Sequence, residues 1–441
     1  MSTSNSLLLL LMTVLFLTLG YLGVPVAFAL IAGVLVGTVF TPITMQSMVA
    51  QLFNGCDSEA LMAIPFFLLV GEMMTSANVV IRIAELSQAL VGHIRGGLAQ
   101  VTTVFSMFFS GMSGSSSADV AVLSRTMAKP MAQEGYRPAF TAALIAAAST
   151  IAALVPPSIM AVVYGAIGNV SIAGLFLGGI VPGLMIYCYF FGPAGFRRPR
   201  STFRGMAKAA SAAALPLFIP VILLGGIMTG WFTPTEAGVI AITYILLVVI
   251  PFLNPGHLKH VPRDFVHAGM IYSLPMITIA AASAFGWMLA YLRGPMVVSS
   301  WISGVSNNDP HRVMFLLVAV FVIVGDFIEP VPAIIIFMPV VTALTDSANI
   351  NAVHMGVVLI VTLAFGLITP PYGLALLMAS KFIGVPFSAA LRASLPIYVV
   401  FFATIAFTIF FPDAILWLPK HVFPESVGCF KSPAGVGYIC P

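Results

Sequence analysis

Charged side chains are scarce in this chain. Lys, Arg, Asp and Glu together make up 7% of the 441 residues, whereas apolar residues make up 60%. Soluble globular domains carry about 25% charged residues, so this scarcity excludes that class. It indicates an integral membrane protein that is embedded in the lipid bilayer. The formal net charge of +4 is also too small to indicate binding to nucleic acid.

Three other patterns are missing from the sequence. The alternating ten-residue segments of a β-barrel are absent, and so is the P-loop motif of proteins that hydrolyse ATP. The first apolar run lacks the basic region and the cleavage site of a signal peptide. At about 20 apolar residues per spanning helix, the expected fold class is an all-α integral membrane protein of roughly ten spans.

Cysteine is rare as well, with four residues in the chain. None belongs to a CxxC pair or to a spacing typical of metal ligands, so no transition-metal site is expected. Only Cys429 and Cys440, both in the polar C-terminal segment, are placed to pair with each other. Such a disulfide requires that this segment lie in an oxidising compartment.

Apolar runs that reach or nearly reach spanning length recur along the chain, at 6–22, 24–41, 60–75, 138–168, 172–192, 212–230, 236–253, 268–292, 352–383 and 395–411. Two segments between them, 76–97 and 41–60, have apolar residues at helical spacing with polar residues between them. This pattern is typical of helices that lie along the membrane surface.

The stretch SGMSGSSSAD, residues 110–119, is a polar interruption between two apolar arms at 98–109 and 120–131. Twelve helical residues extend about 18 Å, against a hydrocarbon core of about 30 Å. We therefore expect the arms to enter and leave on one side, as a re-entrant hairpin with the serines at its tip. The apolar residues 311–346 have the same organisation, with their tip at 326–332.

Proline landmarks indicate an internal repeat, because Pro25, Pro65, Pro156–Pro157 and Pro182 recur in order as Pro234, Pro275, Pro370–Pro371 and Pro396. The first predicted repeat is 1–195, with a re-entrant hairpin at 97–131 and a broken helix at 138–168. The second is 212–411, with a hairpin at 311–346 and a broken helix at 352–383. A basic cytoplasmic linker at 196–211 joins them, and 412–441 form an extracytoplasmic tail.

The number of crossings and the basic residues predict the orientation. Five crossings in the first repeat invert the second repeat relative to it. With the N-terminus outside, most of the 18 Lys and Arg residues fall inside, and only Arg293, Arg312, Lys420 and Lys431 fall outside. Because basic residues concentrate in cytoplasmic loops, both termini are expected outside.

Adjacent prolines interrupt two apolar runs near half their length, at Pro156–Pro157 and Pro370–Pro371. Each pair breaks its helix, which a membrane tolerates only where the break is buried or lines a polar cavity. We expect both breaks and both hairpin tips to converge on such a cavity. Hydroxyl and carbonyl oxygens from 113–117 with 153–156, and from 325–330 with 367–369, are hard ligands suited to Na⁺.

Four carboxylates fall within or beside apolar runs, namely Asp119, Glu236, Asp326 and Glu329. Carboxylates are costly inside a membrane, so each is a candidate functional or hairpin-stabilising group. The alternative for each is a structural role, as the cap of a helix N-terminus.

An enzymatic alternative comes from the same tip, because GMSGSSSA contains the GxSG pattern of intramembrane serine proteases. That chemistry needs a histidine base on a neighbouring span. The histidines lie in loops or at helix ends, and His354 begins the second broken helix near the outer surface. The protease alternative is therefore disfavoured.

Taken in order, the segments AIPFFLLVGEMM, GMSGSSSADVAVL, VPPSIMAVVYG, GWFTPTEAGVIA, GDFIEPVPAIIIFMPV and GLITPPYGLAL resemble the large membrane subunit of tripartite ATP-independent periplasmic (TRAP) transporters. The resemblance implies a sodium-coupled secondary transporter of the bacterial inner membrane, with an elevator mechanism. The implied partners are a small four-helix membrane subunit and a periplasmic binding protein that delivers an organic acid such as a C4-dicarboxylate. A standalone carboxylate or anion transporter of the same superfamily is the main alternative.

The resemblance also implies two sites for sodium and solute, one at each hairpin tip. The first comprises Ser113, Gly114, Ser115, Ser116 and Ser117 with Pro156, Pro157 and Ser158. The second comprises Gly325, Asp326, Glu329 and Pro330 with Thr369, Pro370, Pro371 and Gly373. The family commonly has asparagine at the position of Ala375. Whether this chain makes the polar contact of that asparagine near the second site is therefore left open.

Overall fold

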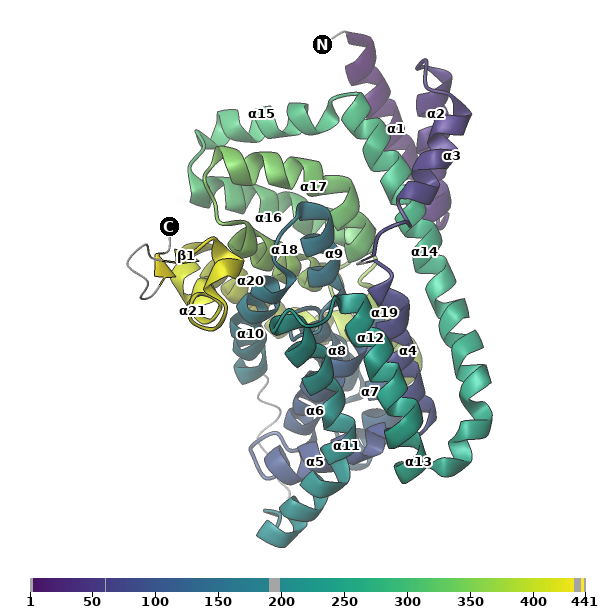
Figure 1. The fold of residues 1–441 in the computed structure, drawn as a ribbon, viewed down its shortest axis with the longest axis vertical. Helices are drawn as coiled ribbons and strands as arrows, with labels where there is room; N and C mark the ends of the chain where they lie inside the picture. Colours follow the sequence, from purple (N-terminus) through teal and green to yellow (C-terminus); the bar gives the residue numbers. More distant parts are fainter. Residues whose placement is uncertain (1–2, 60, 190–198, 432–437, 440–441) are drawn as a thin grey trace.

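The computed structural model describes residues 3–59, 61–189, 199–431 and 438–439, and nearly all of them are helical (Figure 1). Six helices in this part are long and apolar enough to cross a membrane, and several shorter apolar helices accompany them. The prediction of an all-α membrane protein is therefore confirmed. Strands occur among the described residues only as a short ribbon, β1 (Phe430–Lys431) with β2 (Tyr438–Ile439).

Helices in the first half follow the predicted apolar runs closely. The outer elements are α1 (Thr3–Tyr21), α2 (Val26–Val39), α3 (Met45–Asn54), α4 (Ala63–Ser76) and α5 (Val80–Val91). They are followed by α6 (Leu98–Ser113), α7 (Ser116–Gln133), α8 (Pro138–Ser149), the 3-10 turn η1 (Thr150–Ala153), α9 (Ile159–Gly168) and α10 (Ile172–Tyr189).

The second half contains longer outer helices. It contains α11 (Phe203–Met228), α12 (Pro234–Tyr244), the π-helical η2 (Ile245–Val249), α13 (Ile250–Leu253), the 3-10 helix η3 (Pro255–His260), α14 (Val261–Tyr291) and α15 (Gly294–Ser306). It continues with α16 (Pro310–Phe327), α17 (Pro330–Ser347), α18 (Ala352–Gly366), α19 (Leu374–Ile383), α20 (Phe387–Phe410), α21 (Pro412–Val422) and η4 (Pro424–Val427). The repeat relation between the halves stays a prediction.

The segment predicted to lie along the membrane surface at 76–97 forms α5, which is bent by 80° from α4. Its buried side chains include Val80, Ile83 and Leu86, and the helix packs against α6 and α11. An apolar face at helical spacing thus covers the start of the first hairpin. In the segment 41–60, α3 begins after Thr44, whose hydroxyl accepts a hydrogen bond from Ser47 N at 3.2 Å, and it packs on α14.

The two hairpins are present, but their arms are longer than predicted. α6 has 16 residues and α7, α16 and α17 have 18 each, so the arms extend about 24–27 Å. The expectation of twelve-residue arms is wrong for α6 because the helix continues into the polar stretch as far as Ser113, where Ser110 donates its hydroxyl to the Ser106 carbonyl. Figure 1 shows α6 and α7 in the lower part of the molecule and α16 and α17 in the upper part.

The segment predicted as a linker, 196–211, is also partly helical. Among its described residues, α11 begins at Phe203, after Thr202 accepts a hydrogen bond from Gly205 N at 3.2 Å. This N-cap starts the helix eight residues or more before the apolar run. The linker is therefore shorter than predicted.

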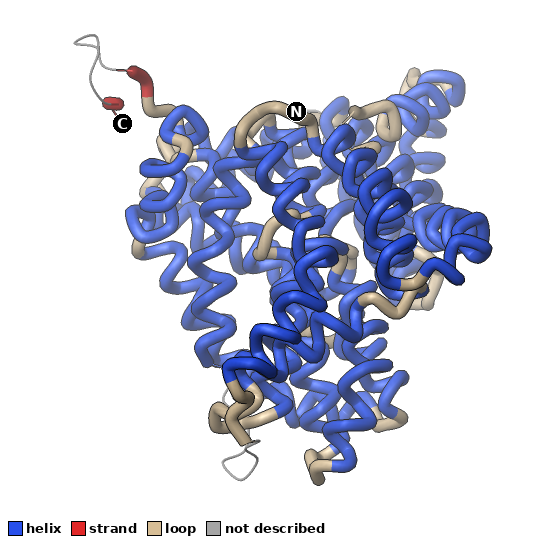
Figure 2. The backbone as a smooth tube through the Cα atoms, turned by 60° about the horizontal axis from the view of Figure 1, so that its bottom comes forward, coloured by secondary structure: helices blue, strands red, loops and turns tan. Residues whose placement is uncertain are grey.

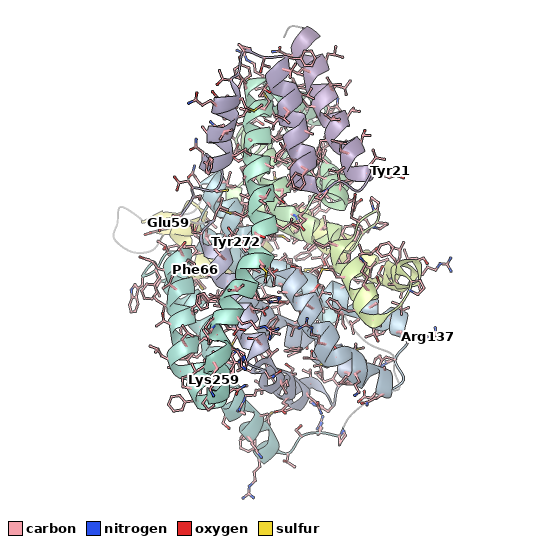
Figure 3. All side chains as sticks on the ribbon, turned by 90° about the vertical axis from the view of Figure 1, so that its right-hand side faces the viewer. Tyr21, Glu59, Phe66, Arg137, Lys259 and Tyr272 are labelled. Carbon is pink, nitrogen blue, oxygen red and sulfur yellow. The ribbon has the colours of Figure 1, made fainter. Side chains whose placement is uncertain are left out.

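Each hairpin packs against the broken helix of the other half. α7 contacts α19, and α17 contacts α9, in addition to the contacts of α7 with α8 and of α17 with α18. α14 runs alongside and contacts α2, α4 and α17, and Figure 3 shows it on one face with Tyr272 partway along its length. The two halves are consequently interlocked at the centre of the molecule.

The C-terminal segment lies at the edge of the helical body, where Figure 2 shows its strands projecting from the last helices. Cys429 is disulfide-bonded, whereas Cys56 is a free thiol. Cys440, the predicted partner of Cys429, lies outside the described residues. The strand register pairs Phe430 with Ile439, the residues that adjoin Cys429 and Cys440 in the sequence.

Candidate functional site

The first double proline breaks its helix as predicted. Residues 154–158 separate η1 from α9, and the Pro156–Pro157 peptide bond is cis. Ser158 closes the break from one side, because its hydroxyl donates to the Ala153 carbonyl at 2.5 Å and accepts from Ala161 N at 3.2 Å. One serine thus caps α9 and links it to the end of the preceding helix.

The tip of the first hairpin rests on this break. Gly114 ends α6 with a φ of +58°, and its carbonyl accepts a bond from Ile159 N at 3.4 Å. A Cβ atom at Gly114 would lie 2.7 Å from the Pro157 carbonyl oxygen. Glycine is therefore required here both for the left-handed backbone and for the close approach.

Asp119 clamps the two arms of the first hairpin together. It is completely buried on α7 and accepts hydroxyl hydrogen bonds from Ser113 (2.5 Å), Ser110 (2.7 Å) and Ser106 (3.3 Å), all on α6. Ser106 also donates to the Ala148 carbonyl at 2.8 Å, which ties the hairpin to α8. Of the two predicted roles, this carboxylate has the hairpin-stabilising one.

The second tip is joined to the second break by a different pair. Residues 367–373 separate α18 from α19, and the Pro370–Pro371 bond is also cis. Thr369 in this break donates its hydroxyl to Asp326 Oδ1 at 2.5 Å. Behind this pair the backbones touch, since a Cβ atom on Gly366 would lie 2.8 Å from the carbonyl carbon of Gly325.

The other two carboxylates have contrasting surroundings. Glu236 belongs to a capping box: its side chain accepts from Thr233 N at 2.9 Å, and its own N–H donates to the Thr233 hydroxyl at 3.3 Å. Its role is therefore structural. Glu329 occupies the N-cap position of α17 without capping it, and its side chain is exposed. The capping alternative for Glu329 is wrong.

The two breaks supply oxygen atoms suited to a hard cation. The carbonyl groups of Pro156, Pro157, Pro370 and Pro371 accept no hydrogen bond from any described residue. Such free carbonyls beside hydroxyl groups form the kind of donor set that binds Na⁺ at discontinuous membrane helices.

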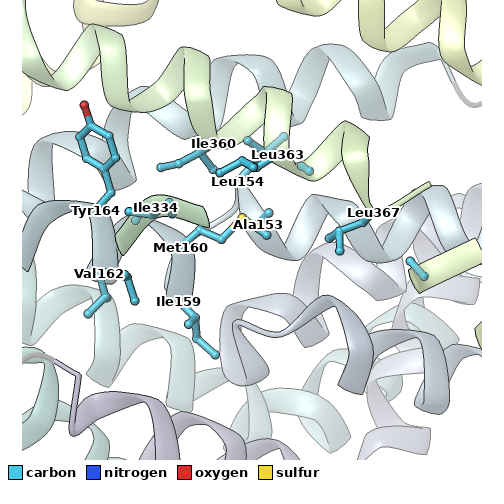
Figure 4. Packing of buried hydrophobic residues seen from close by; sticks show 14 of the residues in the cluster. Ala153, Leu154, Ile159, Met160, Val162, Tyr164, Ile334, Ile360, Leu363 and Leu367 are labelled. Carbon is cyan, nitrogen blue, oxygen red and sulfur yellow. The ribbon is translucent and has the colours of Figure 1, made fainter. Parts of the chain in front are cut away.

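One cavity of about 330 Å³ joins the two tips at the centre of the molecule. From the predicted sites it is lined by Gly114, Ser115, Ser116, Ser117, Glu329 and Pro330. Apolar side chains of the first break and of α9, α17 and α18 pack together in the core, among them Leu154, Met160, Ile334 and Leu363 (Figure 4), and Met160 also lines the cavity. The other predicted site residues belong to the tips and breaks but do not line the cavity.

One side of the cavity was missed by the sequence analysis. Ile64 and Leu68 of α4 and Ile271, Leu274 and Pro275 of α14 also line it. These residues belong to apolar runs without a polar signal, and Pro65 and Pro275 indicated only the repeat. The apolar wall therefore became visible only when the helices were placed in space.

A family profile described as "Tripartite ATP-independent periplasmic transporter, DctM component" matches residues 12–414. The chain belongs to this family. It is thus a large permease subunit of the TRAP transporters, and the enzymatic alternative is wrong.

Curated TRAP permeases resemble this chain over most of its length. The "C4-dicarboxylate TRAP transporter large permease protein DctM" of Pseudomonas aeruginosa is 35% identical over 403 residues, covering 88% of this chain and 93% of that protein. The "Sialic acid TRAP transporter large permease protein SiaM" of Vibrio cholerae is 34% identical, covering 91% and 96%. The "Ectoine/5-hydroxyectoine TRAP transporter large permease protein UehC" of Ruegeria pomeroyi is 32% identical, covering 92% and 97%.

Proposed function

We propose that this TRAP permease couples the entry of Na⁺ to the import of an organic acid. The observation that carries the proposal is one cavity lined by both hairpin tips and by residues beside both helix breaks, Ile159 and Met160 at the first and Leu367 and Leu374 at the second. Unpaired carbonyl oxygens of the two breaks lie beside the hydroxyl-rich first tip and the Asp326–Thr369 pair of the second. Two equivalent oxygen sites around one solute cavity are the arrangement that coupled transport requires.

The transport movement is proposed to be an elevator motion of the hairpins and broken helices against the outer helices. The interlocked packing of α7 with α19 and of α9 with α17 supports their movement as one unit. A contact that such a motion must break joins the Tyr372 hydroxyl to the Gly20 carbonyl at the end of α1. Tightly packed units that move as rigid bodies fit the known repertoire of transport motions.

The partners follow from the family. The permease is proposed to function with a small four-helix membrane subunit and with a periplasmic binding protein that delivers the solute. Relatives are named for C4-dicarboxylate, sialic acid and ectoine, so the class of solute proposed here is a small carboxylate-bearing compound.

The chain is proposed to lie in the bacterial inner membrane with both termini in the periplasm. The disulfide at Cys429 supports an oxidising environment for the C-terminal segment. Arg137 and Lys259, which the orientation places inside, both lie toward the lower end of the molecule in Figure 3. A shared basic end is the pattern expected of the cytoplasmic side.

Uptake into proteoliposomes tests the proposal. The permease and its small subunit are reconstituted, and labelled organic acids are offered with and without the cognate binding protein and an inward Na⁺ gradient. Uptake that needs both the gradient and the binding protein is expected. Uptake without the binding protein would favour the standalone transporter, and uptake indifferent to Na⁺ would refute sodium coupling.

A further inference from the structure

The charge of the central cavity is one-sided. Its lining contains the Glu329 carboxylate but, among the described residues, no Lys, Arg or His. Asp119 and Asp326 do not line it, and both accept hydrogen bonds from hydroxyl groups. Glu329 is therefore the ionisable side chain that a solute in this cavity meets.

Glu329 has no partner within the described part of the chain. No hydrogen bond or ion pair is formed by its side chain, and the first residue of α17, Pro330, has no N–H to offer. A carboxylate that has no partner attracts a cationic group or a hydrogen-bond donor. The geometry thus leaves a place for a positively charged group next to Glu329.

The opposite tip offers hydrogen-bond donors. The hydroxyls of Ser115 and Ser117 lie 3.1 Å apart at the surface of the tip, and the buried hydroxyl of Ser116 has no hydrogen-bond partner among the described residues. Ser115 is the N-cap residue of α7, but its side chain makes no capping bond. Three hydroxyls at a helix N-terminus suit a carboxylate group.

We infer that the cavity selects a small zwitterionic solute, with its carboxylate at Ser115–Ser117 and its ammonium or other cationic group at Glu329. The inference rests on the proposed transport function and narrows its class of solute. A dicarboxylate would place its second negative charge beside the Glu329 carboxylate, and like charges repel. The cavity volume of about 330 Å³ lies at the small end of ligand pockets.

Thermal stabilisation of the purified permease with its small subunit tests the inference directly. The probes are two pairs of solutes of matched length, 4-aminobutyrate with succinate and 5-aminovalerate with glutarate, each titrated in Na⁺ and in choline. In the wild type, the zwitterion of each pair is expected to stabilise at a concentration about tenfold lower than the dicarboxylate. Equal or stronger stabilisation by the dicarboxylates, or none by either zwitterion, would overturn the inference.

The variant Glu329→Gln keeps the shape of the side chain and removes its charge. It is expected to abolish the preference for the zwitterions while leaving the Na⁺ concentration for half-maximal stabilisation unchanged. Asp346→Asn, the same change at an exposed position of α17, is expected to keep the preference. If Glu329→Gln instead shifts the Na⁺ dependence equally for every solute, Glu329 is a sodium ligand and the inference is wrong.

The two proposals fail in different ways. Stabilisation by zwitterions that is independent of Na⁺ in the wild type would contradict sodium coupling while supporting the inferred solute class. Sodium-dependent uptake of a cognate solute that has two carboxylates and no cationic group would support coupling and overturn the solute class.

Discussion

The Ser113 hydroxyl donates a 2.5 Å hydrogen bond to Asp119 Oδ1, and this bond joins the last residue of one hairpin arm to the first turn of the other. The same carboxylate accepts bonds from Ser110 and Ser106. The serine-rich tip is thereby divided into two parts. Ser106, Ser110 and Ser113 hold the hairpin, whereas Ser115, Ser116 and Ser117 line the cavity.

Replacing Asp119 by alanine is expected to destabilise the permease. The substitution removes three hydrogen bonds to a charged acceptor and leaves buried hydroxyls unpaired, a loss of about 3 kcal/mol. The thermal unfolding midpoint of the purified protein, followed by intrinsic fluorescence, should fall by several degrees. Ser124→Ala is the matched control, because Ser124 lies on the same helix and its buried hydroxyl has no partner in the described structure. Equal midpoints for the two variants would contradict the clamp.

Gly366→Ala should disrupt the contact between α18 and the second hairpin. The new methyl group would lie within 2.9 Å of the Gly325 backbone, and backbone atoms in a packed interface cannot move aside. Overpacking of this kind costs about 1–3 kcal/mol, so we expect a lower unfolding midpoint and reduced uptake. In Gly304→Ala, where the added Cβ atom meets nothing within 4 Å, stability should be unchanged or higher. Wild-type behaviour of both variants would refute the close approach.

The helix breaks could be predicted from sequence because their cause is local. A double proline breaks a helix wherever it stands, and both breaks occur where the sequence places them. The length of the first arm could not be predicted from the apolar run, because Ser110 lies beyond that run and continues the helix by donating to the Ser106 carbonyl. Hydropathy reflects the free-energy cost of placing a polar side chain in the membrane, but not the hydrogen bonds that offset this cost.

The four carboxylates look alike in the sequence but differ in the structure. The role of Glu236 was readable, because Thr233 three residues earlier completes the pattern of a capping box. The role of Asp119 was partly readable, since Ser106, Ser110 and Ser113 share one face of a helix at spacings of four and three residues. The sequence did not reveal that Glu329 has no partner, because this depends on which helices surround the second tip.

Labelling of the C-terminal cysteine tests the proposed orientation. In a variant whose Cys56 and Cys188 are replaced by serine, a membrane-impermeant reductant followed by an impermeant maleimide is applied to intact spheroplasts. Because the Cys429 disulfide is expected in the periplasm, labelling should require the reductant but no permeabilisation. Labelling only after permeabilisation would place the C-terminus inside and reverse the orientation.

If the permease couples to Na⁺ as proposed, the contact between Thr369 and Asp326 predicts an effect of the second break on the sodium dependence of uptake. Thr369→Val preserves the shape of the side chain but removes the hydroxyl that donates to Asp326 at 2.5 Å. The break would then lose the side-chain hydrogen bond that joins it to the second tip. A hydrogen bond to a charged group is worth about 1.5–3 kcal/mol, so the Na⁺ concentration for half-maximal uptake should rise about tenfold or more.

Thr369→Ser keeps the hydroxyl and should retain near-normal sodium dependence, which separates the hydrogen bond from the packing of the methyl group. Uptake by the two variants is compared over a range of Na⁺ concentrations at a fixed, saturating amount of solute-loaded binding protein. If Thr369→Val and Thr369→Ser both require more Na⁺ to the same extent, the effect comes from packing of the methyl group and not from the hydrogen bond. An unchanged sodium dependence in Thr369→Val would remove this break from the coupling site, because a ligand shell that loses its orienting bond must bind the ion less tightly.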